Sequence, residues 1–356
     1  MIKHVQIAVL LSIVITCAFL RVRGGGASSS GAGAVGRPPA ATAQMVFMSP
    51  AHGGPFPPGR HNIPWEIVIM NLDGSGRRQL TNDGKFKFLP HFSPDGAKIA
   101  YTKFAVGGYG DPNARMDAYV YDLASGQETQ LTHSGIDVQP IWSPDGQRLA
   151  YGTYHSDSIS VMNADGSNPH VIGRRSGTAE DLLWGDFAWS NDNWILFTAA
   201  QNTNNCFKMR TEKIRPDGTS RTQVSDGGPN CTPKGFEQSG DADPGWSHDA
   251  KTIFSSRGFP VHPAGNPSAT ERKLYSFSSG PWYPGKPEKD LSLPSEPSCI
   301  EGVPKGSPDG TQILLYRLCF DTGSPVGGVY LTDTAGSYRK FITQGFGPDW
   351  NPAWKP

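Results

Sequence analysis

Trp142-Ser143-Pro144-Asp145-Gly146 is the stretch of sequence that decides the fold, because the chain repeats it. Related segments recur at intervals of 47 to 60 residues around Ser93, Ser190, Ser247 and Ser307. In each segment an apolar run ends at the first position, a tight turn follows, and a second apolar run such as residues 149–154 returns. Pro-Asp-Gly between two such runs is a turn signal with a known backbone geometry. The repeat therefore predicts one β-hairpin used several times.

Each repeat continues with two further strands joined by a second turn. Residues 67–71 lead into Asp73-Gly74, and residues 77–81 return beside them. Four antiparallel strands in a unit of this length are the signature of a β-propeller blade. The composition agrees with many short strands and frequent turns, because 43 residues are Gly and 31 are Pro.

The two ends of the chain complete the count of blades. Residues 349–354 match an inner strand such as residues 138–142, with Trp354 at the position of Trp142, and residues 45–48 match the strand that returns. We therefore expect the C-terminal strand to pair with the N-terminal strand within one blade, which removes exposed sheet edges. The predicted fold is an all-β, six-bladed β-propeller of four-stranded antiparallel blades, closed by pairing of the two terminal strands.

The hairpin, the Asn-x-Asp-Gly-Ser segment at residues 71–75 and the Leu-Thr pair at residues 80–81 together resemble the repeat of the TolB propeller and its WD-type relatives. The resemblance covers nearly all of residues 45–356. TolB carries an additional α/β domain before its propeller, whereas this chain has a short linker there, so we expect a TolB-like chain without that domain. Propellers of this type host scaffolds, peptidase accessory domains and polysaccharide lyases, so the resemblance implies the fold more strongly than the function.

The N-terminal segment has the pattern of an export signal. Lys3 and His4 precede an apolar run over residues 5–20, and residues 24–44 are rich in Gly, Ala, Ser and Pro. We expect a signal peptide or N-terminal anchor at 1–23, a linker at 24–44 and the propeller at 45–356. The predicted location is periplasmic or secreted, and three outcomes stay open for the N-terminus: cleavage, lipidation at Cys17, or retention as a membrane tether.

The charge balance argues against nucleic acid as a partner. Lys plus Arg and Asp plus Glu both number 32, so the chain lacks the broad positive field on which nucleic-acid binding depends.

Four cysteines follow the N-terminal segment, and an exported chain permits disulfides. Cys299 and Cys319 lie equally far from Asp309, at the centre of one hairpin turn, so the blade places them opposite each other. Cys206 and Cys231 flank the Asp217-Gly218 turn almost symmetrically. We predict both pairs as disulfides within their blades, and the alternative is four buried free thiols.

The predicted connections are unequal on the two faces of the propeller. One face carries tight Asp-Gly turns and the other carries long loops, which are where binding sites usually lie. The residues five positions before the end of each inner strand are predicted to begin these strands and to surround the channel mouth: Lys87, Asp137, Trp184, Asp241, Glu301 and Asp349. Such a set could hold Ca²⁺ or a basic group of a partner, and the alternative is a set of separate solvated carboxylates.

Further candidates fall in the long loops of the same face: His52, His61, Tyr109, His133, His155 and His262. Histidine serves as a metal ligand or as an acid or base, but this spacing matches no ligand motif, and scattered surface histidines are the alternative. His91 and His248 lie within or just after their own hairpins, where we expect structural roles.

We predict an exported, monomeric, non-catalytic binding propeller that engages a protein, a peptide or an envelope glycan through its long-loop face. It needs no cofactor, with Ca²⁺ in the central channel as the open possibility. The alternative function is a polysaccharide lyase or glycan hydrolase with a metal near the channel mouth. No nucleophile motif such as Gly-x-Ser-x-Gly is present.

Overall fold

The computed structural model describes residues 43–50, 64–108, 111, 113–154, 157–175, 181–203, 206–227, 237–260, 270–293, 299–319 and 327–353. Over these ranges the regular secondary structure is entirely β-strand, so the prediction of an all-β chain is confirmed. A search of the same ranges finds no helix with the length and apolar character needed to span a membrane.

The strands form antiparallel sets of four neighbouring strands, and we call each set a unit. Five units are continuous in sequence, and the first unit combines β24 with β1, β2 and β3. The first unit has the order β24 (Phe346–Trp350), β1 (Met45–Pro50), β2 (Trp65–Met70) and β3 (Arg78–Gln79). The second unit contains β4 (Lys87–Phe92), β5 (Lys98–Val106), β6 (Arg115–Asp122) and β7 (Glu128–Gln130). The third contains β8 (Asp137–Trp142), β9 (Arg148–Thr153), β10 (Ser158–Asn163) and β11 (His170–Arg174).

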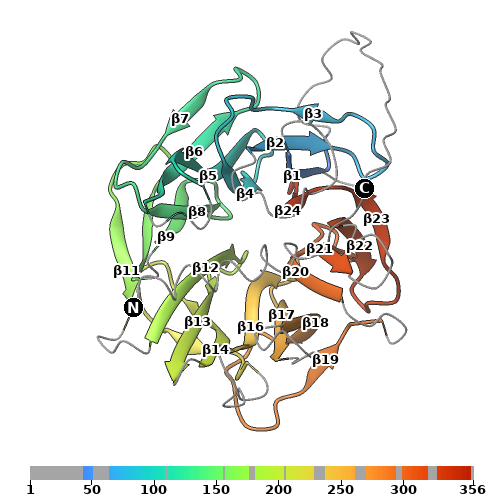
Figure 1. The fold of residues 1–356 in the computed structure, drawn as a ribbon. Helices are drawn as coiled ribbons and strands as arrows, with labels where there is room; N and C mark the ends of the chain where they lie inside the picture. Colours follow the sequence, from blue (N-terminus) through green and yellow to red (C-terminus); the bar gives the residue numbers. More distant parts are fainter. Residues whose placement is uncertain are drawn as a thin grey trace.

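The remaining units are joined into a single sheet by two short parallel pairings, β14 with β16 and β18 with β20. The fourth unit contains β12 (Asp181–Trp189), β13 (Ile195–Thr203), β14 (Cys206–Ile214) and β15 (Thr222–Gln223). The fifth contains β16 (Glu237–Trp246), β17 (Thr252–Pro260), β18 (Thr270–Ser278) and β19 (Glu288–Asp290). The sixth contains β20 (Cys299–Gly306), β21 (Gln312–Cys319), β22 (Gly328–Asp333) and β23 (Lys340–Thr343). The units are arranged radially, with β4, β8, β12, β16, β20 and β24 innermost (Figure 1).

The core lies between neighbouring units, because strands of each sheet bury apolar side chains on both faces. One cluster joins Val46 of β1, Leu89 of β4, Tyr101 of β5 and Tyr316 of β21, all at most 5% exposed. Burial of this kind is the main source of stability in a propeller, since each sheet alone would expose two apolar faces.

The repeated hairpin is held by the Ser and Asp of its turn. In the third unit the Ser143 hydroxyl donates to Oδ1 of Asp145 at 2.5 Å and accepts the Arg148 amide at 2.9 Å. Gly146 adopts a positive φ of 69°, which the turn requires and which glycine tolerates best. Trp142 then pairs with Leu149, so the predicted hairpin is confirmed.

The repeat position of the last inner strand differs from the prediction. β24 pairs with β1 as Met45 opposite Trp350 and Val46 opposite Asp349, so Trp350 takes the place predicted for Trp354. Trp354 itself lies outside the described residues. Asp349 therefore lies next to the end of its strand, and its predicted place at the strand start is wrong. The misplacement arose because Trp350-Asn351-Pro352 lacks the Ser-x-Asp that marks the other turns.

Candidate functional site

Every inner strand contains a β-bulge. The pairing of β4 with β5 slips between Phe88 and His91, and equivalent irregularities occur in β8, β12, β16, β20 and β24. In five of these strands the bulge brings the residue three positions before the end of the inner strand into the left-handed region. These residues have φ from 44° to 60°: Leu89, Gln139, Asp243, Val303 and Gly347. A bulge redirects side chains, and for a β-branched residue such as Val303 a positive φ is a strained conformation.

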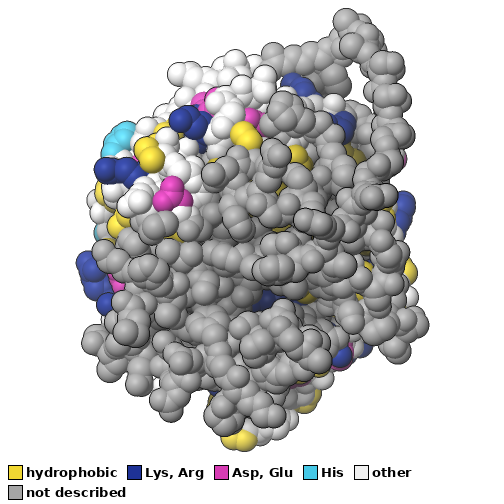
Figure 2. Space-filling view, in the orientation of Figure 1, with side chains coloured by type: hydrophobic (Ala, Val, Ile, Leu, Met, Phe, Trp, Pro, Cys, Tyr) yellow, Lys and Arg dark blue, Asp and Glu magenta, His cyan; other side chains and the backbone are white. Residues whose placement is uncertain are grey.

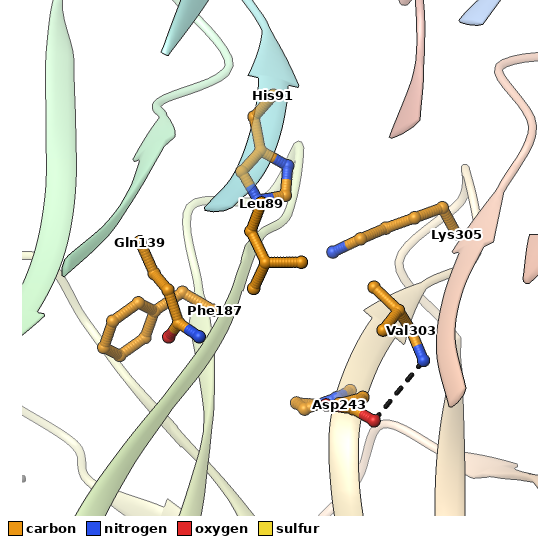
Figure 3. Close-up of a pocket in the computed structure, with 8 residues that line it drawn as sticks. Leu89, His91, Gln139, Phe187, Asp243, Val303 and Lys305 are labelled. Atoms are coloured by element: carbon orange, nitrogen blue, oxygen red, sulfur yellow. Dashed lines mark hydrogen bonds between the residues drawn. The ribbon is translucent and has the colours of Figure 1, made fainter. Parts of the chain in front are cut away.

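The bulged segments surround a small cavity among the inner strands. Figure 3 shows side chains of β4, β8, β12, β16 and β20 converging on it. The empty space is about 250 Å³ with open solvent included, and its lining consists of Leu89, His91, Gln139, Phe187, Asp243, Pro244, Val303 and Lys305. Apolar walls with a few polar groups are typical of ligand sites, although this cavity is smaller than most.

His91 connects the cavity to the terminal strand. Its Nδ1 lies 3.3 Å from Oδ2 of Asp349, and the same oxygen accepts the Phe92 amide at 3.2 Å. Burial lowers the pKa of His91 below its ordinary value of 6.5, the contact with Asp349 opposes this shift, and the nearby Lys305 charge adds to it. The histidine is therefore held in its neutral form near pH 7.

Two charged residues face the same cavity from neighbouring units. Asp243 of β16 is 4% exposed, and its carboxylate accepts the Val303 amide at a long 3.4 Å (Figure 3). Lys305 of β20 is partly buried, and its backbone carbonyl accepts the indole N–H of Trp350 at 2.8 Å. The cavity thus combines an apolar wall with one acidic group, one basic group and one neutral imidazole.

The residues predicted at the channel mouth occupy equivalent positions in their inner strands, with the exception of Asp349. Each pairs with a residue of the second strand of its own unit: Lys87, Asp137, Trp184, Asp241 and Glu301. Lys87 and Asp137 begin their strands as predicted. The strands of Trp184, Asp241 and Glu301 begin two to four residues earlier.

These charged side chains are buried and already engaged, so the alternative of solvated carboxylates is wrong for them. Their exposed fractions are 0% for Lys87, 7% for Asp137, 0% for Asp241 and 4% for Glu301. Lys87 Nζ lies 2.7 Å from Oε2 of Glu66 and also contacts Asp83. Their role in binding a partner stays a prediction.

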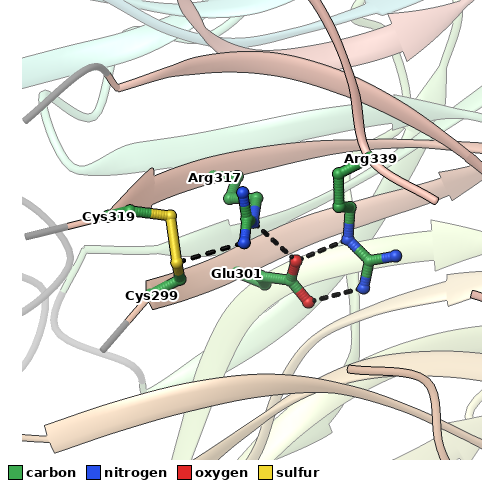
Figure 4. The surroundings of a disulfide bond; sticks show 5 residues. All are labelled: Cys299, Glu301, Arg317, Cys319 and Arg339. Atoms are coloured by element: carbon green, nitrogen blue, oxygen red, sulfur yellow. Dashed lines mark hydrogen bonds and ion pairs between the residues drawn. A yellow bond between two sulfur atoms is a disulfide. The ribbon is translucent and has the colours of Figure 1, made fainter. Parts of the chain in front are cut away.

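The acidic members have basic or hydroxyl partners within the chain. Asp241 receives a bidentate pair from Arg257, with Nε at 2.7 Å and Nη2 at 2.8 Å. Glu301 lies between Arg317, whose Nε is 3.0 Å away, and Arg339, whose Nε is 2.6 Å away (Figure 4). Burial raises the pKa of Asp137, although hydroxyls of Ser134 and Thr132 oppose the shift. Breaking such buried pairs is costly, which favours a structural contribution from these contacts.

Most of the predicted long-loop residues, namely His52, His61, Tyr109, His155 and His262, lie outside the described residues. His133 is described, and it is exposed in the connection between β7 and β8. Within the described ranges no three His, Cys, Asp or Glu side chains lie close enough to hold a metal ion. The Ca²⁺ expectation therefore stays a prediction. On the described part of the face in Figure 2, acidic and basic side chains are interspersed.

Sequence reasoning missed the cavity residues His91, Gln139, Asp243 and Lys305. A signal was present, because each of these residues lies one or three positions before the end of its inner strand. Regular alternation along a strand does not predict a bulge, however, so the side-chain directions could not be derived from periodicity.

The Sγ atoms of Cys299 and Cys319 are joined in a disulfide, the pairing that the hairpin symmetry predicts (Figure 4). The two residues face each other across β20 and β21, and Nη2 of Arg317 lies 3.1 Å from Sγ of Cys299. Cys231 lies outside the described residues, so the pairing of Cys206 with Cys231 stays a prediction.

Four-stranded antiparallel sheets arranged radially about a small central cavity define a β-propeller. The TolB beta propeller domain model matches residues 57–235, half of the chain. The chain therefore belongs to the family of TolB beta propeller domains.

Individual relatives agree with this family. The chain is 29% identical over 118 residues to a protein TolB homolog of Chlorobaculum tepidum, and this match covers 33% of this chain and 24% of that protein. It is 33% identical over 93 residues to the Tol-Pal system protein TolB of Alcanivorax borkumensis, and that match covers 26% of this chain and 20% of the relative. The matches thus span a quarter or less of these relatives. A solved structure of TolB from Acinetobacter baumannii is similar with a TM-score of 0.57 at 17% identity, over 89% of this chain and 68% of that one, which shows the fold alone.

Proposed function

We propose that the units are six blades and that the pairing of β24 with β1 closes them into a ring. Two contacts support closure besides the strand pairing itself. The Asn351 side-chain amide donates to the Ala43 carbonyl at 2.8 Å, and the Asn351 backbone amide donates to the Gln44 carbonyl at 2.8 Å. Closure places the bulged inner strands around a common axis, so the cavity becomes a central channel site.

We propose that this propeller is a non-catalytic binding module that engages a protein of the cell envelope. The observation that carries the proposal is the cavity itself, because it is built from a repeated bulge and presents groups of several units to one ligand. The family supports a protein partner, since one relative is named a Tol-Pal system protein. A segment of a partner that enters the channel fits a cavity of this size better than a large rigid ligand does.

The proposed location is the periplasm or the cell exterior. The basic and apolar pattern of residues 1–23 supports export, residues 24–44 serve as a linker, and residues 45–356 form the propeller. The disulfide between Cys299 and Cys319 supports an oxidising compartment. Tethering through Cys17 or a retained anchor is compatible with the same role.

The enzymatic alternative, a polysaccharide lyase or glycan hydrolase, has no observation of its own in the described residues. Of the five loop histidines on which it depends, four lie outside them. We keep it as an outcome of the test.

The test is affinity capture from cell-envelope extract with three forms of the full chain. Gln139→Arg fills the cavity, Asp137→Asn neutralises one channel-mouth residue, and Tyr283→Ser changes a side chain that is 54% exposed and distant in sequence from the inner strands. We expect the wild type and Tyr283→Ser to retain the same envelope protein and Gln139→Arg to lose it. Melting curves check that all three are folded.

An unchanged capture profile for Gln139→Arg contradicts binding in the channel. Loss with Asp137→Asn as well assigns the mouth residue to the contact. Stoichiometric metal in the purified protein, together with new ultraviolet absorbance on acidic polysaccharides, favours the lyase instead.

A further inference from the structure

The next-to-last residues of the six inner strands in the described ranges occupy equivalent positions. In chain order these residues are His91, Ile141, Ala188, Gly245, Lys305 and Asp349. Among them are one acid and one lysine, on the neighbouring strands β24 and β20. A simple expectation is that these two form an ion pair.

The structure pairs the acid with a different neighbour. Asp349 binds Nδ1 of His91 at 3.3 Å and the Phe92 amide at 3.2 Å. The other carboxylate of the cavity, Asp243, accepts the Val303 amide. In the part of the chain that the structure describes, the Lys305 ammonium has neither a hydrogen bond nor an ion pair.

The surroundings of this ammonium strengthen its attraction for an anion. Its side chain extends from β20 across the cavity towards Leu89 (Figure 3). Leu89, Val303 and Phe187 supply apolar walls and are at most 5% exposed. A positive charge that lacks a partner and is partly removed from water is unfavourable, and an anion bound there would offset that cost.

We propose that the cavity binds a single carboxylate group through Lys305. Size is the first argument, since about 250 Å³ including open solvent lies below the roughly 300 to 1,000 Å³ of typical ligand pockets and so favours a small group. Charge is the second: Asp243 in the same cavity repels any anion, and it repels a phosphate group, which carries the higher charge on one group, more than a single carboxylate group. Phosphate sites also use several donors, often from Arg.

The carboxylate can come from a free small acid or from a Glu or Asp side chain of a protein. In the second case the inference rests on the proposed function and names what the channel recognises in its partner. The two sources share the same contact with Lys305, so the test uses a probe for each.

The experiment is calorimetric titration of the full chain with glutarate and with two capped pentapeptides, Gly-Gly-Glu-Gly-Gly and its Gln counterpart. The variant is Lys305→Met, and the control is Lys251→Met, which removes the same charge from a side chain that is 83% exposed in the turn before β17. We expect saturable binding of glutarate or the Glu peptide, weakened at least about tenfold by Lys305→Met and unchanged by Lys251→Met. The Gln peptide is expected not to bind.

Glutarate binding identifies a free acid as sufficient, and binding of the Glu peptide alone identifies a protein side chain. Equal affinity of wild type and Lys305→Met, equal affinity for the Glu and Gln peptides, or no binding of any probe overturns the proposal. Lys305→Met removes an unpaired charge, so it should melt no lower than the wild type, and Lys305→Gln provides a second variant if it does not fold. Channel-dependent capture of an envelope protein without carboxylate binding keeps the proposed function and removes only this inference.

Discussion

Nδ1 of His91 and the carboxylate of Asp349 lie 3.3 Å apart although 258 residues separate them in sequence. The contact joins β4, the first strand of the second unit, to β24, the innermost strand of the first unit. It therefore links these two neighbouring units at the wall of the central cavity. A titratable group at such a junction makes stability depend on pH.

We predict that stability falls on mild acidification because of His91. Burial lowers the pKa of His91 in the folded chain below 6.5, so the unfolded chain binds the proton more readily. The contribution of the neutral His91 imidazole to stability is therefore fully present above pH of about 6.5. It is lost as pH falls through the lowered pKa of the folded chain. Asp349 and Lys305 are the charged groups that face the imidazole, and their opposite effects partly cancel. Urea unfolding between pH 7.5 and pH 5 measures this loss.

His91→Gln removes the titrating group and should flatten the pH dependence over that interval. The matched control is His248→Gln, because His248 is exposed at the turn before β17 and should leave the wild-type slope unchanged. Identical slopes for wild type and His91→Gln would show that another group is responsible.

Two tryptophans at the same repeat position provide an internal comparison. The Trp350 indole donates to the Lys305 carbonyl at 2.8 Å, whereas Nε1 of Trp142 has no hydrogen-bond partner among the described residues. Both side chains are at most 8% exposed, so Trp→Phe removes similar apolar area at each site. We predict that Trp350→Phe costs about 1 kcal/mol more than Trp142→Phe in chemical denaturation, since only Trp350 loses a hydrogen bond. Equal losses at the two sites contradict this assignment.

The sequence predicted the repeat well because its turns depend on local chemistry. Ser-x-Asp-Gly specifies its own hydrogen bonds, so the hairpin at Trp142 and Leu149 and the opposition of Cys299 and Cys319 followed from spacing alone. The last inner strand was shifted by four residues because Asn351 replaces the turn serine there. A degenerate repeat leaves the register undetermined until the strand pairing is known.

The cavity was not predictable in the same way. Its residues depend on bulges, and a bulge changes the side to which Gln139 and Val303 project without changing the apolar pattern that a strand shows. The pairing of Asp241 with Arg257 was also hidden, since the two residues are 16 positions apart on different strands. Sequence reasoning therefore assigned to solvent or to ligands several charges that are matched within the chain.

The disulfide gives a further prediction. Cys299→Ser with Cys319→Ser should lower the free energy of unfolding by roughly 2 to 4 kcal/mol, because the cross-link closes a loop across one hairpin. The measurement is urea unfolding with and without dithiothreitol. The double variant should still respond to the reductant through the predicted bond between Cys206 and Cys231, and a variant without all four cysteines should not. A wild type that is indifferent to dithiothreitol contradicts both disulfides.

The turn serines offer a prediction for the fold itself. Ser143 is fully buried, donates to Asp145 and accepts the Arg148 amide, whereas Ser167 makes the same kind of bond to Asp165 in an exposed outer turn. Ser143→Ala should cost about 1 to 3 kcal/mol, because it leaves a partly buried amide without its acceptor, and Ser167→Ala should cost much less.

The Ser143 hydroxyl is also the main cause of the lowered pKa of Asp145. The stabilisation from the bond between Ser143 and ionised Asp145 is present above pH of about 3.8 and is lost as pH falls through the lowered pKa. The difference in unfolding free energy between wild type and Ser143→Ala should therefore shrink in acid. A difference that stays constant from pH 7 to pH 2 shows that the hydroxyl acts on the amide alone and not on the carboxylate.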